Sequence, residues 1–481
     1  MITADRVTRP ATDERSIWLP RCSWCAAALL WLLIGPVPVS ASATPHEYRV
    51  QVADDLSSVL VRAQFAAAVS ELQAEQGRSE YLRGTDRCDT GSLRLAGNRI
   101  LAGELRCLEY EYPLQALQDR RNPPVAADVR VTTPAAWLWR PSRAASRGIQ
   151  VTFVLPPGIR VSVPWQALGD GRFVVSDSPG SSTAIAVFGR FEEAVIGSGN
   201  AAIRVALIDG PQQRLDRNRM LSWLGTSIAD VASVGGRFPS PGAQVIVQPV
   251  PSGGRSAVPF GYVIRDGGES VRFFVDASRS LTDLDGDWTA THEFSHLLLP
   301  YVRSREKWIS EGFSSYYQNV LLARRGIYSP LEAWQRLHRA FTQADAVADP
   351  PVLSRIDERP FRDMRMLIYW SGAAMALMAD VRLRELSAGH ESLDSVLARL
   401  AACCLPSAQI WRGEELFSRL DSLSTHPVFI PLYRAFVSSE GMPDLRSLYT
   451  DLGLETAGPD LRLRDDARLA SIRSAIMQGS Q

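Results

Sequence analysis

Two histidines stand four residues apart in the segment "THEFSHLLLPYVRSREKWISEGFSSYY", which spans residues 291–317. On a helix, His292 and His296 project from one face about one turn apart, close enough to share a metal ion. Glu293 is rotated about 100° from His292, a placement that suits a base acting on water beside that ion. This spacing is typical of zinc sites built for hydrolysis. We therefore predict a helix that carries two zinc ligands and a general base.

The chain contains its own controls for this motif. A histidine followed by a glutamate also occurs at His46 and at His390, and neither has a second histidine four residues further on. Only the pair that begins at His292 completes the pattern. The alternative interpretation is an ordinary helix with two solvated histidines.

Glu311 is the candidate third ligand, with fourteen residues between it and His296. It lies within "WISEGFSSYYQ", whose apolar residues recur at helical intervals and predict a buried face. An unpaired carboxylate there would be costly to bury, and a zinc ion would compensate for its charge. The alternative is a surface glutamate in a first helical turn, where the helix dipole favours it. We predict one Zn²⁺ per chain, held by His292, His296 and Glu311.

The elements that must position these residues change along the chain. From about residue 46 to 205, short β-branched runs alternate with turn residues, which favours an antiparallel, sandwich-like domain. After that a mixed segment leads into long helical patterns. We expect an α+β multidomain protein with an N-terminal β domain at 44–200, a catalytic domain at 201–420 and a C-terminal helical extension at 421–481 without an evident PDZ domain. The stretch "IGSGNA" at 196–201 is the candidate boundary.

Residues 1–43 have the features of a secretory signal peptide. Arginines precede the apolar run "CAAALLWLLIGPVPV", which ends at the small-residue site "ASA". The run is shorter than the roughly 20 residues that a membrane span needs. We expect export to the periplasm or the extracellular space, with no stable membrane span after cleavage. An uncleaved N-terminal anchor is the alternative.

Four cysteines remain after the expected cleavage. Cys88 and Cys107 flank a strand, turn and strand pattern, so we expect a disulfide across that hairpin in an oxidising compartment. For Cys403 and Cys404 the sequence leaves buried thiols, a vicinal pair and other partners open.

The charge pattern bears on possible partners. The chain has 52 basic and 52 acidic residues and no long run of either sign. A phosphate backbone calls for a clustered positive charge, so we expect no nucleic acid partner. The oligomeric state is not indicated.

Beyond these inferences, the segments "HEFSH", "WISEGFSSYYQNVLLARRG" and "YWSGAAMALMADVRLREL" resemble the gluzincin metallopeptidases. The likeness is greatest to the glycyl aminopeptidase family and more distant to the aminopeptidase N family. It is dense from about 285 to 400. It implies an N-terminal β domain ahead of a thermolysin-like catalytic domain. It also implies zinc ligands at His292, His296 and Glu311 and a general base at Glu293.

The resemblance implies two further parts of the site. Tyr369, three residues before Gly372, matches a tyrosine that donates a hydrogen bond to the oxyanion; by itself it reads as a core residue. Family exopeptidases carry a Gly-Gly-x-Glu element whose glutamate holds the substrate's amine. Here "DGGES" is one residue short of that pattern, so Gly268 and Glu269 are candidate substrate-binding residues. Glu269 would hold an amine if it faces the cleft and would be a turn residue if it faces water.

We also expect the strand "VRFFVDAS", residues 271–278, to be a sheet edge that pairs with an extended peptide. The function predicted is an exported zinc-dependent metallopeptidase of the aminopeptidase type. One alternative is a catalytically silent peptide-binding or scaffold protein on a gluzincin frame. A zinc hydrolase acting on other substrates is the third reading.

Overall fold

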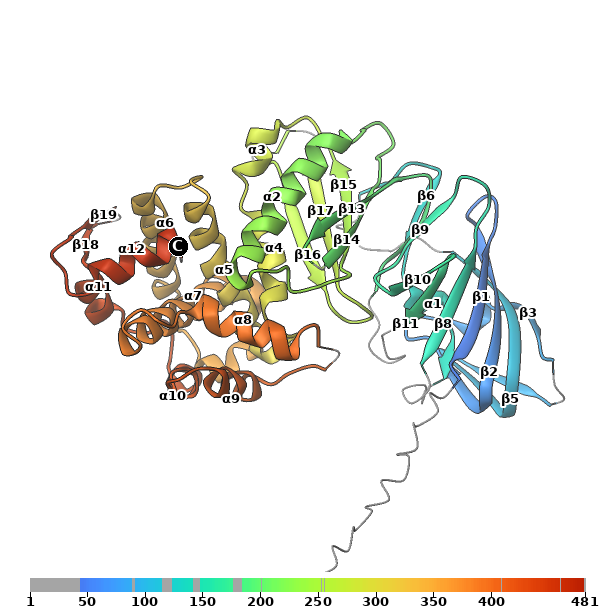
Figure 1. The fold of residues 1–481 in the computed structure, drawn as a ribbon. Coiled ribbons are helices and arrows are strands. Elements are labelled where there is room, and N and C mark those ends of the chain that lie inside the picture. The colour runs from blue at the N-terminus through green and yellow to red at the C-terminus, as the bar shows by residue number, and fades with distance from the viewer. Residues whose placement is uncertain are drawn as a thin grey trace, which may run out of the picture. The chain divides into compact units, whose positions relative to one another are not determined.

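The computed structural model describes residues 44–88, 91–114, 123–141, 148–175, 184–199, 201–251, 253–254, 256–407, 409–458 and 460–479. Residues Thr44–Gln481 form one compact unit. The predicted signal peptide lies outside the described residues. The fold is mixed α+β, with a sheet-rich N-terminal region and a helical C-terminal part (Figure 1).

The N-terminal region is built on a large sheet with the order β10-β11-β8-β1-β2-β5-β3, to which β4 and β7 add at β5 and β2. Alternation of buried and exposed residues along β1 fixes which face meets the core. The neighbouring pairs are antiparallel except β1 with β8, which is parallel. The strands are β1 His46–Val52, β2 Ser58–Gln73, β3 Arg83–Asp86, β4 Leu93–Ala96, β5 Arg99–Pro113, β7 Arg140–Pro141, β8 Ile149–Val154, β10 Gln166–Gly169 and β11 Arg172–Val175.

A second, three-stranded sheet has the order β6-β12-β9, formed by Val129–Thr132, Ala186–Gly189 and Arg160–Ser162. Between the two sheets lie the short helix α1 (Pro134–Trp137) and three fully buried tryptophans, Trp137, Trp139 and Trp165. Aromatic rings thus supply much of the apolar area that holds this region together.

A five-stranded sheet follows, with the order β13-β14-β15-β17-β16. Its strands are β13 Glu192–Ser198, β14 Ala201–Leu207, β15 Gln244–Val250, β16 Phe260–Ile264 and β17 Ser270–Asp276. The expectation that 271–278 forms the edge is wrong: β17 lies between β15 and β16 and is buried along its whole length. The edge is β16. Ile196, Gly197 and Ser198 of the "IGSGNA" stretch belong to β13, which pairs with β14, and this sheet begins at Glu192.

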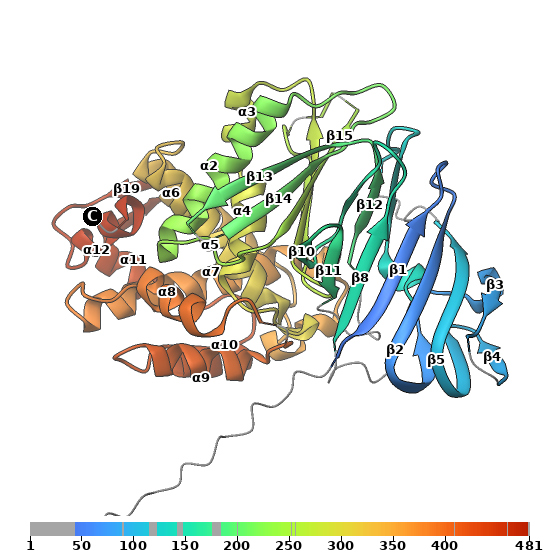
Figure 2. The ribbon, with the colours of Figure 1, turned by 45° about the vertical axis from the view of Figure 1, so that its right-hand side comes forward.

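The two faces of this sheet meet different layers. One face packs against α2 (Arg217–Gly235) and the metal-site helix α4 (Thr289–Ser295), as Figure 2 shows for α2. The other face contributes Ala206, Ile208 and Ile246 to a small apolar cluster with strands β6 and β12 of the N-terminal region. Gln244 also donates a hydrogen bond to Ser162 across this boundary. The sheet therefore joins the metal-site helix to the N-terminal region.

The helical part is organised around α5 (Lys307–Arg324) and α7 (Phe361–Leu386). Among the described residues α7 is the one helix long and apolar enough to cross a membrane, but 72% of its apolar window is buried, as in the central helix of a bundle. The remaining elements are α3 Leu281–Asp285, α6 Pro330–Asp345, α8 Leu393–Cys404, α9 Gly413–Leu423, α10 Phe429–Ser438, α11 Arg446–Leu452, β18 Leu454–Ala457, β19 Asp460–Leu463 and α12 Ala470–Gln478.

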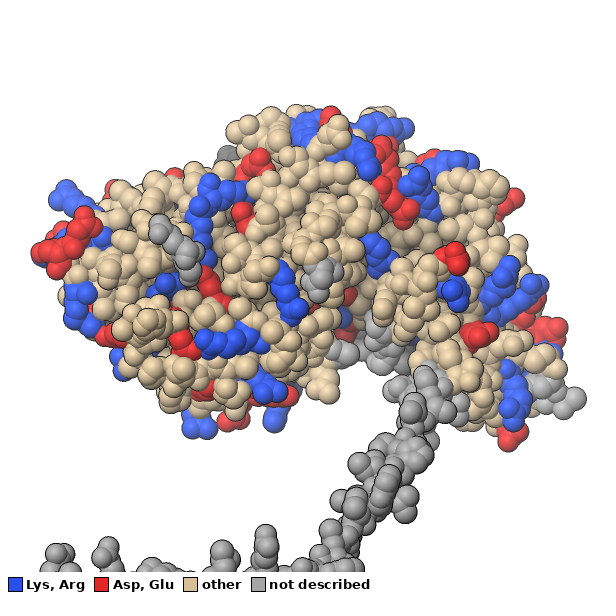
Figure 3. All heavy atoms as spheres, in the orientation of Figure 1, with Lys and Arg blue, Asp and Glu red and all other residues tan. Residues whose placement is uncertain are grey.

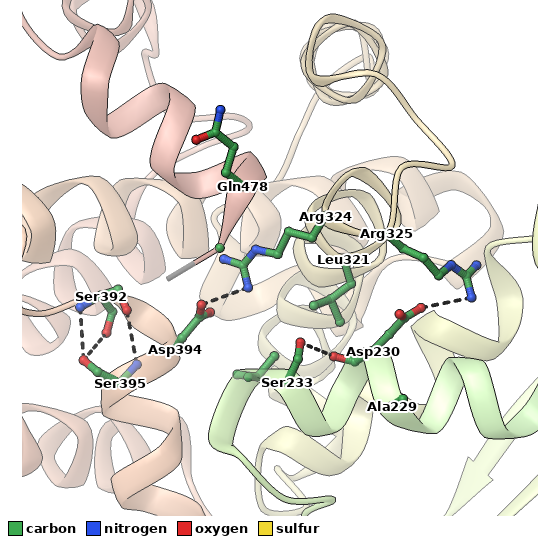
Figure 4. Close-up of a pocket in the computed structure, with 12 residues that line it drawn as sticks. Ala229, Asp230, Ser233, Leu321, Arg324, Arg325, Ser392, Asp394, Ser395 and Gln478 are labelled. Atoms are coloured by element: carbon green, nitrogen blue, oxygen red, sulfur yellow. Dashed lines mark hydrogen bonds and ion pairs between the residues drawn. The ribbon is translucent and has the colours of Figure 1, made fainter. Parts of the chain in front are cut away.

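Buried polar contacts fix α5 against its neighbours. Tyr316 donates to Asp380 of α7, and Tyr317 donates to Asp394 of α8. Figure 4 shows the C-terminal end of α5, where Arg324 pairs with Asp394 at 2.9 Å and Arg325, just after the helix, pairs with Asp230 of α2 at 3.2 Å. Because breaking a buried pair leaves an uncompensated charge, these contacts hold the helices in one register.

The structure joins Cys88 to Cys107 in a disulfide and pairs Cys403 with its neighbour Cys404. The first links the start of the β3–β4 segment to β5. The second closes the C-terminal end of α8. Of the possibilities that the sequence left open for Cys403 and Cys404, the structure has the vicinal pair.

Lysine and arginine side chains are interspersed with aspartate and glutamate over the face drawn in Figure 3. Most of the exposed ion pairs are formed by arginine, for example Arg446 with Asp444. Pairs of this kind contribute little to stability.

Glu391, the acid of the His390-Glu391 control, is a structural residue. Burial acts to raise the pKa of its carboxyl, but hydrogen bonds from Thr425 and the Arg399 ion pair outweigh burial and lower the pKa to about 2. It thereby ties the start of α8 to the segment between α9 and α10.

We predict that Glu391→Gln lowers the free energy of unfolding at pH 7 by about 2–3 kcal/mol. The pKa is depressed in the folded state, so the contribution is complete above about pH 4.5 and disappears as the pH falls towards 2. Urea unfolding at pH 7, 5 and 3 should therefore show the difference between wild type and variant shrinking. A difference that stays constant with pH would contradict this role.

Candidate metal centre

The first two predicted ligands lie at the end of one short helix. Asp287 fixes its start, because one carboxylate oxygen accepts from the Thr289 backbone N–H and the other from the Val258 N–H ahead of β16. His292 lies in α4, which tightens into a 3₁₀ turn at His296–Leu298. Ring centroids of the two histidines are 4.9 Å apart.

Glu311 meets both histidines from the second turn of α5. Its Oε2 lies 3.3 Å from His292 Nε2 and 3.6 Å from His296 Nε2. Ligand bonds of about 2.0–2.1 Å in a tetrahedral zinc site place two ligand atoms roughly 3.3–3.4 Å apart. The three donors lie within 4.8 Å of one another, and no other such group of three or more occurs in the described part of the chain. The donor types and their spacing therefore fit a zinc ion.

The other nitrogen of each histidine is also accounted for. His292 Nδ1 lies 2.7 Å from Gln318 Oε1, and His296 Nδ1 lies 2.8 Å from the Ser310 hydroxyl oxygen. Both partners are on α5: Gln318 lies seven residues after Glu311, and Ser310 lies one residue before it. A neutral imidazole that donates through Nδ1 presents the lone pair of Nε2 to a metal, so these contacts select the ligating tautomer. Neither Gln318 nor Ser310 was predicted from the sequence, although both lie on the helix that was predicted around Glu311.

Glu293 is buried beside the triad, with its Oε2 3.9 Å from His296 Nε2. Burial, reinforced by the charge of Glu311, raises the pKa of Glu293 to about 7. Burial acts in the same direction on Glu311, but the two histidines and Tyr369 outweigh it and lower its pKa to about 2. Burial lowers the pKa of His296 to about 4, as expected for an imidazole that stays neutral.

Tyr369 comes to the same place from α7. Its ring stacks on His292 with centroids 5.8 Å apart, and its hydroxyl hydrogen-bonds to Glu311. Burial and the neighbouring carboxylates raise its pKa, so the phenol keeps its proton. The residue therefore lies at the metal centre and not only in the apolar core.

Two glycines allow α7 to come this close to α5. A Cβ atom on Gly312 would overlap the backbone of Gly372, and one on Gly372 would overlap the carbonyl oxygen of Trp308. Because Gly312 follows Glu311 and Gly372 lies one turn after Tyr369, the helix crossing sets the distance between carboxylate and phenol. A third glycine acts on the sheet side, where a Cβ on Gly261 of β16 would lie 2.8 Å from Glu293 Cγ.

Of the predicted substrate residues, Glu269 is linked to the metal-site helix through Arg265. Glu269 lies in the turn between β16 and β17, and its carboxylate pairs at 3.0 Å with Arg265. Arg265 in turn donates to the His296 carbonyl oxygen at 2.8 Å. A Cβ on Gly268 would meet Pro164 of the N-terminal region. Glu269 is thus a turn residue, as one of the two alternatives had it, but it is largely buried and pairs with Arg265. Its role toward a substrate amine stays a prediction.

The pocket drawn in Figure 4 lies elsewhere. It is lined by residues of α2, α5, α8 and the end of α12, and by none of the residues at the metal centre. Its charged residues are already paired in the ion pairs that fix α5. We therefore assign it no part in the chemistry.

Comparisons with known proteins agree with this geometry. A family model described as M61 glycyl aminopeptidase matches residues 299–354, which include Glu311. The fold is similar to that of an aminopeptidase N family protein from Idiomarina loihiensis, with a TM-score of 0.63 and 14% identity over 85% of this chain and 78% of that chain. No curated protein matches the chain in sequence. The comparisons therefore show a short sequence match to the glycyl aminopeptidase family model and a fold like that of an aminopeptidase N family protein.

A second structure with a similar fold is the M1 zinc metallopeptidase of Deinococcus radiodurans. Its TM-score is 0.52 and its identity 11%, over 84% of this chain and 95% of that chain. A mutant of that enzyme, solved with a Tyr-Ser-Ala substrate, matches over the same shares with the same score. At these identities the likeness establishes the fold.

Replacing the crossing glycine by Gly372→Ala should destabilise the protein by about 1–3 kcal/mol, because the added methyl group forces α7 away from α5. It should also weaken zinc binding, since Glu311 then loses the hydrogen bond from Tyr369 that helps to hold its carboxylate. Thermal unfolding and zinc titration measure the two effects. Gly225→Ala on α2 is the matched control: its Cβ meets nothing within 4 Å, so alanine should be neutral or slightly stabilising. Equal behaviour of the two variants would contradict the crossing constraint.

Loss of the His292 partner in Gln318→Leu should lower zinc affinity by about 10- to 100-fold, because the imidazole is then free to rotate or change tautomer. Competition with a chromophoric chelator measures this directly. Gln343→Leu, at an exposed position on α6, is the control. Unchanged affinity in Gln318→Leu would show that this contact does not orient the ligand.

Proposed function

We propose that this chain is a zinc-dependent metallopeptidase of the aminopeptidase type, exported through its N-terminal signal. The observation that carries the proposal is the convergence of His292, His296 and Glu311 with Glu293 and Tyr369 at one buried centre. A structural zinc site needs neither a base nor a phenol. The family match and the aminopeptidase fold support the same activity, as well as a thermolysin-like arrangement of the catalytic domain.

The chain's residues divide the reaction between them. A zinc ion held by the triad would polarise the peptide carbonyl and acidify the attacking water. Glu293, whose pKa of about 7 lies near the working range of a general base, takes the proton from that water and returns it to the leaving amine. Tyr369 keeps its proton and donates a hydrogen bond where negative charge develops on the carbonyl oxygen. Burial of Glu293 excludes bulk water from this proton transfer.

The substrate backbone has a natural partner in β16. It is the edge strand, and Gly261 brings it against Glu293. Edge strands bind extended peptides through main-chain hydrogen bonds. A Tyr-Ser-Ala substrate occurs in a structure of similar fold, which makes short peptides the first substrates to test.

The test is the products that the zinc-loaded chain forms from free and N-acetylated peptides, read by mass spectrometry. We expect removal of N-terminal residues from the free peptides. Glu293→Gln should retain zinc and lose at least about 10²-fold in turnover. Stoichiometric zinc with no cleavage of any peptide would instead favour the silent binding protein. Full turnover by Glu293→Gln would refute the mechanism.

A further inference from the structure

Lys307 is the only lysine among the chain's 52 lysine and arginine residues. Wherever a positive charge serves a surface or a salt bridge, this chain uses arginine. Lys307 is also the first residue of α5, at the end of a helix where the dipole disfavours a cation. Neither composition nor helix energetics therefore accounts for a lysine one turn before the ligand Glu311.

The ammonium group is placed at the rim of the metal centre. Lys307 Nζ lies 4.2 Å from the ring centroid of Phe361. That ring is 44% exposed and lies 6.4 Å from the ring of Tyr369, which stacks on His292. An unbroken series of rings thus leads from the metal ligand to the ammonium. Within the described residues, no carboxylate lies within ion-pair distance of Lys307.

A second cation belongs to the same rim. Arg365 lies one turn before Tyr369 on α7 and is close enough for its charge to act on the Tyr369 hydroxyl. It is exposed and, among the described residues, has no carboxylate partner. Phe361, Arg365 and Tyr369 follow at intervals of four residues, which places them along one side of α7. Among the described residues, Lys307 and Arg365 are thus two cations on this side of the centre that form no ion pair.

The other carboxylates near the centre do not neutralise it. Glu293 and Glu311 belong to the metal site, and Glu269 is paired with Arg265. An ammonium on an aromatic face still has N–H groups to donate, and its compact charge suits a carboxylate oxygen.

We propose that Lys307, assisted by Arg365, binds a carboxylate group of the peptide substrate. The carboxylate belongs either to the C-terminus of a short peptide or to an acidic side chain. The proposal rests on the peptidase function above and names its substrate class. From Tyr369 to Phe361 α7 rises about 12 Å, and an extended peptide advances about 3.3 Å per residue. The carboxylate thus lies three or four residues from the bond that is cut.

The test measures binding, so it does not depend on turnover. Zinc-loaded Glu293→Gln is titrated by calorimetry with three alanine pentapeptides: one with a free C-terminal carboxylate, its C-terminal amide, and the amide with glutamate as the last residue. We expect at least one carboxylate peptide to bind about tenfold more tightly than the neutral amide. Comparing the two carboxylate peptides shows whether Lys307 binds the C-terminal carboxylate or an acidic side chain. Lys307→Met, combined with Glu293→Gln, should reduce the preference for the carboxylate peptide to about twofold or less. Lys307→Arg in the same background should retain most of that preference.

Arg419→Met removes an exposed cation on α9 and is the matched control, which should keep the full preference. An undiminished preference in Lys307→Met, or no preference in the parent protein, overturns the proposal. Peptides that bind with the expected preference but are never cleaved by the wild-type chain would refute the peptidase function and leave the carboxylate site standing.

Discussion

The close crossing of α5 and α7 is the constraint on which the metal centre depends. At Gly312 and Gly372 the two backbones touch, and no other residue type fits there without moving a helix. Glu311 and Tyr369 are each fixed to a helix at a set distance from that contact. The packing of the two backbones therefore brings these side chains within hydrogen-bonding distance. The histidines join because α4 packs against the same part of α5, where Gln318 and Ser310 hold their rings.

Electrostatics then divides the two buried carboxylates into different roles. Glu311 faces both imidazoles and the phenol, so its charged form is favoured, whereas Glu293 faces apolar surroundings and the charge of Glu311. Neighbouring acids whose pKa values are pushed apart are the usual arrangement of a ligand or stabiliser beside an acid-base catalyst. The same environment keeps His296 neutral, which a metal ligand requires. Sequence spacing identifies Glu311 as a ligand and Glu293 as a base only by their match to a pattern. Their different surroundings in the fold explain why their pKa values, and hence their roles, differ.

How far the sequence predicts the site follows from the range of the forces involved. His292, Glu293 and His296 are fixed by local helix geometry, so their spacing was sufficient, and Glu311 could be found because an acid stood out on a predicted apolar face. The sheet edge was predicted wrongly, because β16 and β17 are both apolar and their order depends on tertiary pairing. The pairing of Glu269 with Arg265 was not predicted because the turn between β16 and β17 brings the two side chains together. Lys307 was not predicted as a site residue because it belongs to no motif; it stands out only as the single lysine of the chain.

These contacts make the two sides of the metal centre electrostatically unlike. On the sheet side, Arg265 is neutralised by Glu269 and used to hold the end of the metal-site helix, so it has little charge left for a ligand. On the α7 side, Lys307 and Arg365 have no such partner within the part of the chain that the structure describes. A peptide pairing with β16 can run in either direction, and main-chain hydrogen bonds alone discriminate weakly between them. In the proposed peptide complex, the positive charge of Lys307 and Arg365 would favour the direction that places a carboxylate on their side, so the field of a few side chains would orient the peptide before the chemistry begins.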